Sequence, residues 1–387
     1  MNDLSKVLGR ENFSTSRIDR IIYGVDASRI EGKASAVALP GSTEQVRRIV
    51  SYAKRLNANI VPRGAGTGLA GGAVPKDSIV VDLSRMNRIL KLDIRRKVVI
   101  AEPGVVLENL NLFLKKYALF FPVLPSSRAA CTIGGMASTN AAGNNAVRYG
   151  RMSDWVDELE IIDGTGKQFV LRGKEAEEFC GTEGTAGIIT RIALKLAEPP
   201  DKKSFMLYRF STINELLDAL RGLKELSITQ VEFLDRLTSA FVGIEPAYHL
   251  FVEFDDDSGE IKDDVKINEL EALRESAYPL LASRGYSFIE DPQVGPEGIG
   301  ELLVWLEKNS VPSFGHLATG IIHPCFSNED LIPGMYDVVR KLNGKISGEH
   351  GIGLKKKEYA EKSVVEKIKK LKKAYDPHRI MNKGKVI

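Results

Sequence analysis

The chain has few cysteines and almost no net charge, and each shortage excludes a class of protein. Its 387 residues contain three cysteines, Cys131, Cys180 and Cys325, which lie far apart without C-x-x-C spacing. They cannot hold an iron–sulfur cluster by themselves, and we expect no disulfides. The formal net charge is +3, from 54 basic and 51 acidic residues, so the composition indicates neither a nucleic-acid-binding protein nor an acidic tail.

Long hydrophobic runs are also lacking. No apolar run approaches the roughly 18 residues that a membrane-spanning helix needs. The first residues, MNDLSKVLGREN, have no apolar signal-peptide core. Basic clusters at 355–357 and 369–373 are typical of a solvated helix face; the alternative is contact with anionic lipid or an acidic partner. We therefore expect a cytoplasmic protein, with peripheral membrane attachment as the alternative.

Residues 61–75, VPRGAGTGLAGGAVP, form a glycine-rich segment with almost nothing that fills a core. Because glycine has no Cβ, such a segment lets its amides approach a pyrophosphate. Gly66, Gly68 and Gly71 satisfy the G-x-G-x-x-G pattern, but a Rossmann loop must open a helix. Here a turn and a strand at 78–83 follow, so we predict a strand–loop–strand phosphate cradle. The bland alternative, a flexible solvent loop, usually carries serine and charge, which this segment lacks.

Two further segments, 125–150 and 181–189, are rich in small residues. They leave little bulk to pack and offer backbone amides and hydroxyls to a ligand. Three such segments in one stretch favour a single extended ligand of the nucleotide type over three unrelated loops.

The first half alternates strands and helices, which gives it α+β or α/β character. We expect strands at 36–40 and 98–102, and amphipathic helices at 44–56 and 107–117. A capping box of Ser42 and Gln45 is expected to begin the first of these helices. Further on, strands are expected at 205–210 and 249–254, with helices at 215–223 and 267–282.

These motifs together resemble the FAD-linked D-2-hydroxyacid dehydrogenases of the vanillyl-alcohol oxidase type, and the resemblance covers most of the chain. The family's P-R-G-x-G-T-x-L-x-G loop corresponds to residues 62–71. Its T-I-G-G and N-A-x-G motifs correspond to 132–135 and 140–143, and E-G-T-x-G-I-I-T to 183–190.

The resemblance implies an α+β fold, with a p-cresol-methylhydroxylase-type FAD-binding domain of two α+β subdomains and a shortened ferredoxin-like substrate cap. It places the FAD-binding domain at 1–200, the cap at 201–340, and a C-terminal segment returning to the FAD domain at 341–387. The implied FAD contacts are Pro62, Arg63, Gly64, Ala65, Gly66, Thr67, Gly68, Leu69, Pro125, Thr132, Gly134, Gly135, Ser138, Asn140, Gly143, Tyr149, Gly184, Gly187, Ile189 and Asn382.

We expect the FAD to be noncovalent. The first histidine of the chain is His249, outside these loops, so a histidyl linkage from them is excluded. Cys131 lies near a flavin loop and offers a thioether as the alternative, but a small buried cysteine is the commoner case.

Four of the five histidines fall in the C-terminal third. His316 and His323 lie seven residues apart, either two helical turns along a helix or neighbours across a loop. With Glu349 they form two imidazoles and a carboxylate, a facial ligand set suited to Zn, Mn or Fe, and His350 is left as a base. The ordinary alternative is a group of satisfied core or surface histidines. The family carries G-H-x-x-x-G-x-x-H and S-G-E-H-G-x-G, which implies the metal site and the catalytic base.

The implied reaction is oxidation of a small D-2-hydroxy acid, D-lactate or glycolate by family frequency, with hydride transfer to flavin N5. An iron–sulfur subunit, an electron-transfer flavoprotein, a quinone or oxygen would reoxidise the flavin. Two departures stand out: residues 318–321 read ATGI where the family has Gly-Asp-Gly-Asn, and Leu306 and Glu307 replace its Arg-Glu pair, which leaves the carboxylate anchor unassigned.

Two alternatives to this enzyme stay open. One is a noncatalytic FAD-binding subunit of an oxidase complex, and the other is a non-redox enzyme like alkyl-glycerone-phosphate synthase. Glu349, where that second group tends to have another histidine, argues against it. A homodimer is compatible with a cap of this kind, although no residue requires it.

Overall fold

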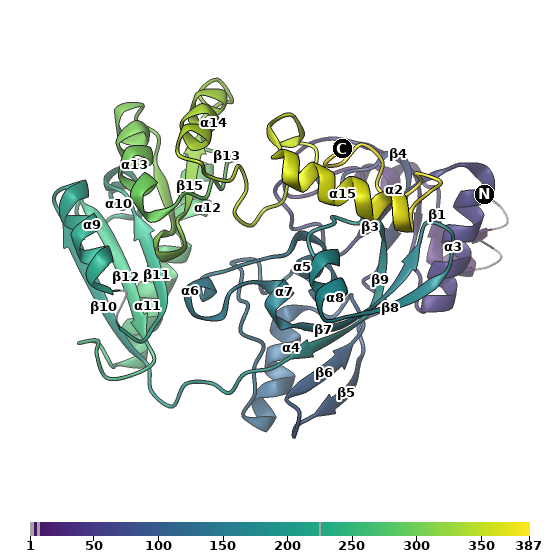
Figure 1. The fold of residues 1–387 in the computed structure, drawn as a ribbon, viewed down its shortest axis with the longest axis horizontal. Coiled ribbons are helices and arrows are strands. Elements are labelled where there is room, and N and C mark those ends of the chain that lie inside the picture. Colours follow the sequence, from purple (N-terminus) through teal and green to yellow (C-terminus); the bar gives the residue numbers. More distant parts are fainter. Residues whose placement is uncertain (1–3, 6–7, 224–225) are drawn as a thin grey trace. The chain divides into compact units, whose positions relative to one another are not determined.

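The computed structural model describes residues 4–5, 8–223 and 226–387 (Figure 1). The chain forms two compact units. The first unit comprises Met1–Ala141, Arg151–Glu198 and Glu349–Ile387, and the second comprises Ala142–Gly150 and Pro199–Gly348. The segment 142–150, expected in the FAD-binding domain, therefore clusters with the second unit, as does 341–348. Among the described residues, no helix is long and apolar enough to cross a membrane.

One sheet of the first unit has four strands in the order β1 (Phe13–Ser14), β2 (Lys33–Ala38), β4 (Lys76–Asp82), β3 (Asn59–Arg63). β3 and β4 are parallel neighbours, and parallel neighbours need a long connection. Here the glycine-rich residues 64–75 make that connection without a helix, as predicted.

The helix α3 (Thr43–Leu56) also follows its prediction. Val46, Ile49, Val50 and Ala53 form its buried face. Ser42 accepts from the Gln45 amide at 3.3 Å, but the Gln45 side chain accepts from the Gly41 amide, so the expected capping box is only half formed.

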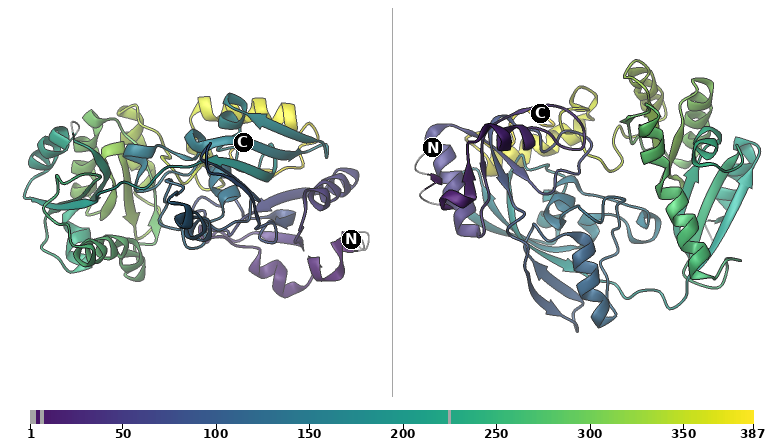
Figure 2. Two further views of the ribbon diagram at one scale, coloured as in Figure 1. Left: turned by 90° about the horizontal axis from the view of Figure 1, so that it is seen from below. Right: turned by 180° about the vertical axis from the view of Figure 1, so that it is seen from behind.

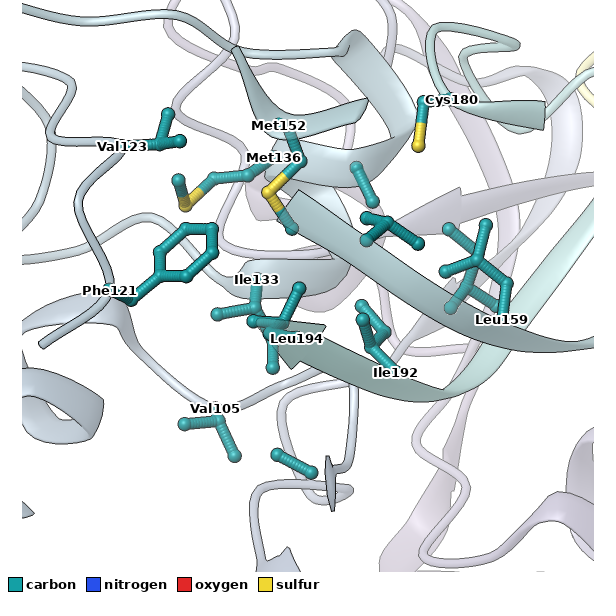
Figure 3. Close-up of a cluster of buried hydrophobic side chains, with 14 of the residues drawn as sticks. Val105, Phe121, Val123, Ile133, Met136, Met152, Leu159, Cys180, Ile192 and Leu194 are labelled. Atoms are coloured by element: carbon teal, nitrogen blue, oxygen red, sulfur yellow. The ribbon is translucent and has the colours of Figure 1, made fainter. Parts of the chain in front are cut away.

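The other sheet of the first unit has the order β5 (Ile89–Asp93), β6 (Val98–Ala101), β9 (Gly187–Lys195), β7 (Val156–Asp163), β8 (Gln168–Arg172), all antiparallel. Its core packs side chains of β7 and β9 against the helix α5 (Ile133–Thr139) and the segment 119–123 (Figure 3). The helices of this unit are α2 (Arg17–Ile22), α3, α4 (Leu107–Leu114), α5 (Ile133–Thr139), α7 (Met152–Trp155), α8 (Lys174–Phe179) and α15 (Lys362–Tyr375). The C-terminal helix α15, drawn in yellow, lies against this sheet (Figure 2). The Tyr375 ring at its end contacts Phe169 of β8 and Phe179 of α8.

The second unit contains a six-stranded antiparallel sheet. Its order is β10 (Ser204–Phe210), β12 (Tyr248–Phe254), β11 (Ile228–Leu234), β14 (Ser313–His316), β15 (Ile321–Phe326), β13 (Phe288–Ile289). Its helices are α6 (Ala146–Tyr149), α9 (Ile213–Gly222), α10 (Arg236–Val242), α11 (Asp264–Glu275), α12 (Ala277–Ser283), α13 (Ile299–Lys308) and α14 (Ile332–Lys341).

One expectation for this unit is wrong. The single helix predicted at 267–282 is two helices, α11 and α12, which meet at Ser276. Pro279 explains the break, since its ring has no N–H and clashes with the carbonyl four residues earlier, that of Glu275. The α+β class itself is confirmed.

Candidate functional site

In the glycine-rich loop, backbone carbonyls accept hydrogen bonds from other parts of the described chain, whereas the backbone amides of residues 64–72 donate none to it. The Gly66 carbonyl accepts from the Ala27 amide, and the Ala70 carbonyl accepts from the Leu354 and Lys355 amides. Within the described part of the chain, none of the amides from Gly64 to Gly72 donates to another protein group. Backbone N–H groups are obligatory donors, so a run of amides without an acceptor in the described chain fits an anionic ligand such as a pyrophosphate.

Two glycines of the loop have different reasons to be glycine. A Cβ on Gly64 would lie 2.4 Å from the Thr132 hydroxyl, so packing within the protein forbids a side chain there. A Cβ on Gly68 would meet nothing within 4 Å. The space beside Gly68 is thus open to a ligand, which is what an FAD pyrophosphate requires.

The first and third small-residue segments, residues 125–141 of the second, and the C-terminal segment converge in the first unit. Gly184 packs on Pro62, where a Cβ would come within 2.6 Å of the proline ring. The Glu183 amide donates to the Ser138 carbonyl at 2.8 Å. The Asn382 side chain donates to the Gly72 carbonyl at 2.9 Å and to the Glu183 carbonyl at 2.6 Å. One extended ligand can therefore touch all four segments.

Several of the predicted FAD contacts have visible structural roles. The Thr132 hydroxyl caps α5 by accepting from the Gly135 amide, and the Gly134 amide donates to the Pro103 carbonyl. Gly187 and Ile189 lie on β9, and Ile189 belongs to the hydrophobic core. Their contact with FAD stays a prediction.

The structure also places the remaining residues predicted to contact FAD, and those contacts stay predictions. The Arg63 side chain donates to the Val25 carbonyl. The Pro125 carbonyl accepts from the Arg128 amide, and the Asn140 side chain accepts from the Ser153 amide. Ala65, Thr67 and Leu69 lie in the loop itself, while Gly143 and Tyr149 lie in the second unit.

His316 and His323 lie on neighbouring strands of one hairpin in the second unit, so the loop alternative of the sequence analysis is the correct one. His316 ends β14, and His323 lies on β15 opposite Phe314. Gly320 closes the turn with a positive φ of 72°, and a Cβ there would lie 2.0 Å from the Val294 carbonyl. The two imidazole rings end 5.3 Å apart, centroid to centroid.

Glu349 joins this pair. It is the first residue of the C-terminal stretch Glu349–Ile387, which clusters with the first unit, and it directly follows Gly348 in the chain. One ligand atom from each of His316, His323 and Glu349 lies within 4.8 Å of the others. Two imidazoles and a carboxylate at that separation fit a divalent transition metal with open coordination positions.

Each histidine is held through its Nδ1 atom. His316 Nδ1 lies 2.6 Å from Glu232 Oε1, and His323 Nδ1 lies 3.3 Å from the Glu290 carbonyl oxygen. A carbonyl only accepts, so His323 Nδ1 carries the proton and Nε2 carries the lone pair. Glu290 is itself anchored, because its carboxylate accepts from the Tyr336 hydroxyl at 2.5 Å.

The base of the hairpin is fixed by another buried carboxylate, Asp235. It caps α10 through the Thr238 amide and accepts from the Ser313 amide and hydroxyl at the start of β14. Burial raises the pKa of Asp235 to about 6.

His350 follows Glu349, and its Nε2 atom lies 3.6 Å from Glu349 Oε1. The turn after His350 is held by Glu183, whose two carboxylate oxygens accept from the Ile352 amide at 2.7 Å and the Gly353 amide at 2.8 Å. Burial raises the pKa of Glu183 to about 7.

The sequence analysis did not assign roles to Glu183, Glu232 or Arg274. Glu183 lies in the E-G-T-x-G motif, whose glycines alone predict cofactor contacts. An acid between apolar residues, as in QVEFLD, was the available signal for Glu232.

Comparison with known proteins identifies the family. Residues 34–172 match the family described as "FAD binding domain", and residues 253–386 match "FAD linked oxidases, C-terminal domain". The chain belongs to the FAD-linked oxidases of the vanillyl-alcohol oxidase type. The first unit therefore contains an FAD-binding domain, and the recognition made from the sequence motifs is confirmed.

Relatives span nearly the whole chain. Glycolate oxidase subunit GlcD of Bacillus subtilis is 28% identical over 99% of this chain and 95% of its own. D-2-hydroxyglutarate dehydrogenase of Xanthomonas citri pv. viticola is 29% identical over 91% and 89%. The mitochondrial D-lactate dehydrogenase [cytochrome] of Arabidopsis thaliana is 27% identical over 99% and 79%.

Solved structures of this family share the fold. p-Cresol methylhydroxylase superposes with a TM-score of 0.79 at 15% identity, over 100% of this chain and 95% of its own. An alkyldihydroxyacetonephosphate synthase gives 0.71 at 18%, over 99% and 84%. At these identities the likeness shows the fold alone.

Proposed function

We propose that this protein oxidises a small D-2-hydroxy acid to the 2-oxo acid, with FAD as the hydride acceptor. The proposal rests on the cluster of His316, His323 and Glu349 in a chain of the FAD-linked oxidase family. His350, the proposed base, follows Glu349 in the sequence. The names of three relatives, which act on glycolate, D-2-hydroxyglutarate and D-lactate, support the substrate class.

The amides of Gly64 to Gly72 would hold the FAD pyrophosphate, with Asn382 and Ser138 on the segments that converge on the loop. Bound FAD supplies a hydride acceptor at flavin N5. The chain's part in that step is to hold the cofactor with fixed backbone donors, which need no rearrangement when the reaction occurs.

His316 and His323, through Nε2, and Glu349, through a carboxylate oxygen, would hold a divalent metal ion. A metal ion there supplies Lewis acidity toward the substrate hydroxyl and carboxylate. Its identity is proposed as Zn, Mn or Fe from the mixed imidazole and carboxylate ligands.

His350 is the proposed general base. It would take the hydroxyl proton at a ring nitrogen. Bound FAD would supply the acceptor for the carbon-bound hydrogen, a hydride that carries one proton and two electrons. A positioned base contributes about 10²–10⁴-fold to such a step. Glu183 holds the turn after His350 through two amides, which limits the positions that the imidazole can take.

We propose D-lactate or glycolate as the substrate. The reduced flavin then needs a second acceptor, for which an iron–sulfur subunit, an electron-transfer flavoprotein, a quinone and oxygen are the candidates. A homodimer and a cytoplasmic location, with peripheral membrane attachment as the alternative, remain expectations.

The test is an anaerobic visible spectrum of the FAD- and metal-loaded protein, titrated with D-lactate, glycolate, D-2-hydroxyglutarate and the L-isomers. We expect one D-acid or glycolate to bleach the flavin band. Chelation should suppress the bleaching and added divalent metal should restore it. A flavin band that no acid bleaches would contradict the proposal and favour a noncatalytic subunit, a reading to which the name "glycolate oxidase subunit" of one relative lends weight.

A further inference from the structure

Two charged residues buried in the second unit, Glu232 and Arg274, have no part in the reaction described above. Glu232 lies on β11 directly opposite His316 in the strand ladder. Arg274 lies near the end of α11 and forms an ion pair with Glu232. Their exposed fractions are 3% and 4%. Burying such a pair costs about as much as it gains, so stability alone does not explain it.

The two oxygens of Glu232 are divided between two partners. Oε1 lies 2.6 Å from His316 Nδ1, and Oε2 faces the Arg274 guanidinium. An ionised carboxylate only accepts hydrogen bonds, so His316 Nδ1 carries the proton and the lone pair is on Nε2. We propose, on the basis of the function proposed above, that Glu232 and Arg274 are positioning residues that fix His316 in the tautomer able to bind the metal.

His323 shows the same arrangement with a different acceptor. Its Nδ1 atom donates to a backbone carbonyl, that of Glu290. Both histidines therefore present Nε2, the nitrogen needed for a shared ligand position. Outer partners of this kind commonly set the orientation and basicity of metal-binding histidines. The Nδ1 partner of His316 is the side chain of Glu232, which mutation can remove.

Arg274 is held in place by an aromatic ring. Its guanidinium carbon lies 5.8 Å from the centroid of Phe314, and the Phe314 ring lies 5.1 Å from that of His323. A planar guanidinium stacks on a ring in a way that a lysine ammonium does not. The Phe314 ring therefore lies between the Arg274 guanidinium and the His323 imidazole in the chain of contacts around the site.

The first experiment measures metal affinity in the FAD-loaded full-length protein by calorimetric titration with Co²⁺. We expect Glu232→Ala to weaken Co²⁺ binding by about 10–100-fold, with FAD content unchanged. Glu232→Gln, whose amide oxygen can still accept from Nδ1, should lose less. Arg274→Met and Arg274→Lys should both weaken binding, since neither supplies a planar guanidinium.

Glu253→Gln is the matched control. Glu253 lies on the neighbouring strand β12, is also buried, and bonds to Thr229 and Lys203 without an imidazole partner. The Co²⁺ affinity of the Glu253→Gln protein should equal that of the wild type. Unchanged affinity in Glu232→Ala would overturn the inference. A raised KM in Arg274→Met with unchanged Co²⁺ affinity would also overturn it, and would make Arg274 a substrate-carboxylate anchor instead.

A second measurement needs no metal. In metal-free, histidine-¹⁵N-labelled protein, with His316 assigned from His316→Asn, the ¹⁵N shifts should show His316 protonated at Nδ1. Glu232→Gln should keep that tautomer, and Glu232→Ala should shift it toward a mixture. If the wild type binds no divalent metal, the metal part of the proposed function fails, yet this spectrum still decides the role of Glu232. Protonation at Nε2 in the wild type would overturn it.

Discussion

Two buried glutamates show how differently the two units build their sites. In the first unit, Glu183 is bound by main-chain groups, the amides of Ile352 and Gly353. In the second unit, Glu232 is bound by side chains, those of His316 and Arg274. The first site is a backbone cradle and the second is a side-chain network, which suits one to an extended phosphate-bearing cofactor and the other to a metal ion.

The difference also separates the expected consequences of mutation. A backbone cradle tolerates side-chain changes unless they fill its space or unfold its turns. A side-chain network fails when one member is removed. Each prediction below acts on one feature of the protein and is compared with a stated reference.

The largest effect is expected at His350. His350→Ala removes the base while leaving the glycine loop intact, so we expect yellow, FAD-loaded protein whose flavin is reduced by substrate about 10²–10⁴-fold more slowly. Stopped-flow absorbance under anaerobic conditions measures this. Full reduction at the wild-type rate would remove His350 as the base.

The next effect is on the pH dependence of stability. Burial raises the pKa of Glu183 to about 7 in the folded state from its ordinary value of 4.5, so the folded state holds this proton more tightly than the unfolded state. The contribution of Glu183 to the free energy of unfolding is therefore present below pH 4.5 and is lost as pH rises through 7, by at most about 3 kcal/mol.

Urea unfolding of wild type and Glu183→Gln at pH 5 and pH 8 tests this sign. The loss of unfolding free energy from pH 5 to pH 8 should be smaller in the variant, because glutamine does not titrate. Asp235→Asn provides the comparison in the second unit, where the pKa of Asp235 is raised to about 6 and the change should end at lower pH. Equal pH slopes for wild type and Glu183→Gln would contradict the account.

The smallest effect is expected in the loop. Gly68→Val places a side chain in the open space beside the loop amides proposed to bind the pyrophosphate. Because that side chain would compete with the cofactor for the space, we expect FAD affinity to fall about tenfold, equivalent to ~1.4 kcal/mol. Gly222→Val is the control, since a Cβ there also meets nothing within 4 Å but the residue lies at the end of α9. Equal FAD affinity of the two variants, measured by flavin fluorescence, would show that the space beside Gly68 is not used.

The two sites were not equally accessible to sequence reasoning. The cradle could be predicted because glycine composition and the order strand, loop, strand are local properties. The histidines could be found from their motif, although the spacing alone did not choose between helix and loop. Glu232 and Arg274 could not be found, because their partnership with His316 depends on strand register and helix packing across 84 residues of chain. The break between α11 and α12 is a local property that Pro279 indicates, although the expected helix at 267–282 ran through it.

The measurement that tests the account most directly is the FAD and metal content of one preparation of active protein and of His323→Ala. The account predicts one FAD and one divalent metal per chain in the wild type. In His323→Ala it predicts that the metal is lost and the FAD retained, because His323 belongs to the second unit and the glycine loop to the first. Active wild-type protein with FAD but without a stoichiometric divalent metal would contradict the assignment of His316, His323 and Glu349.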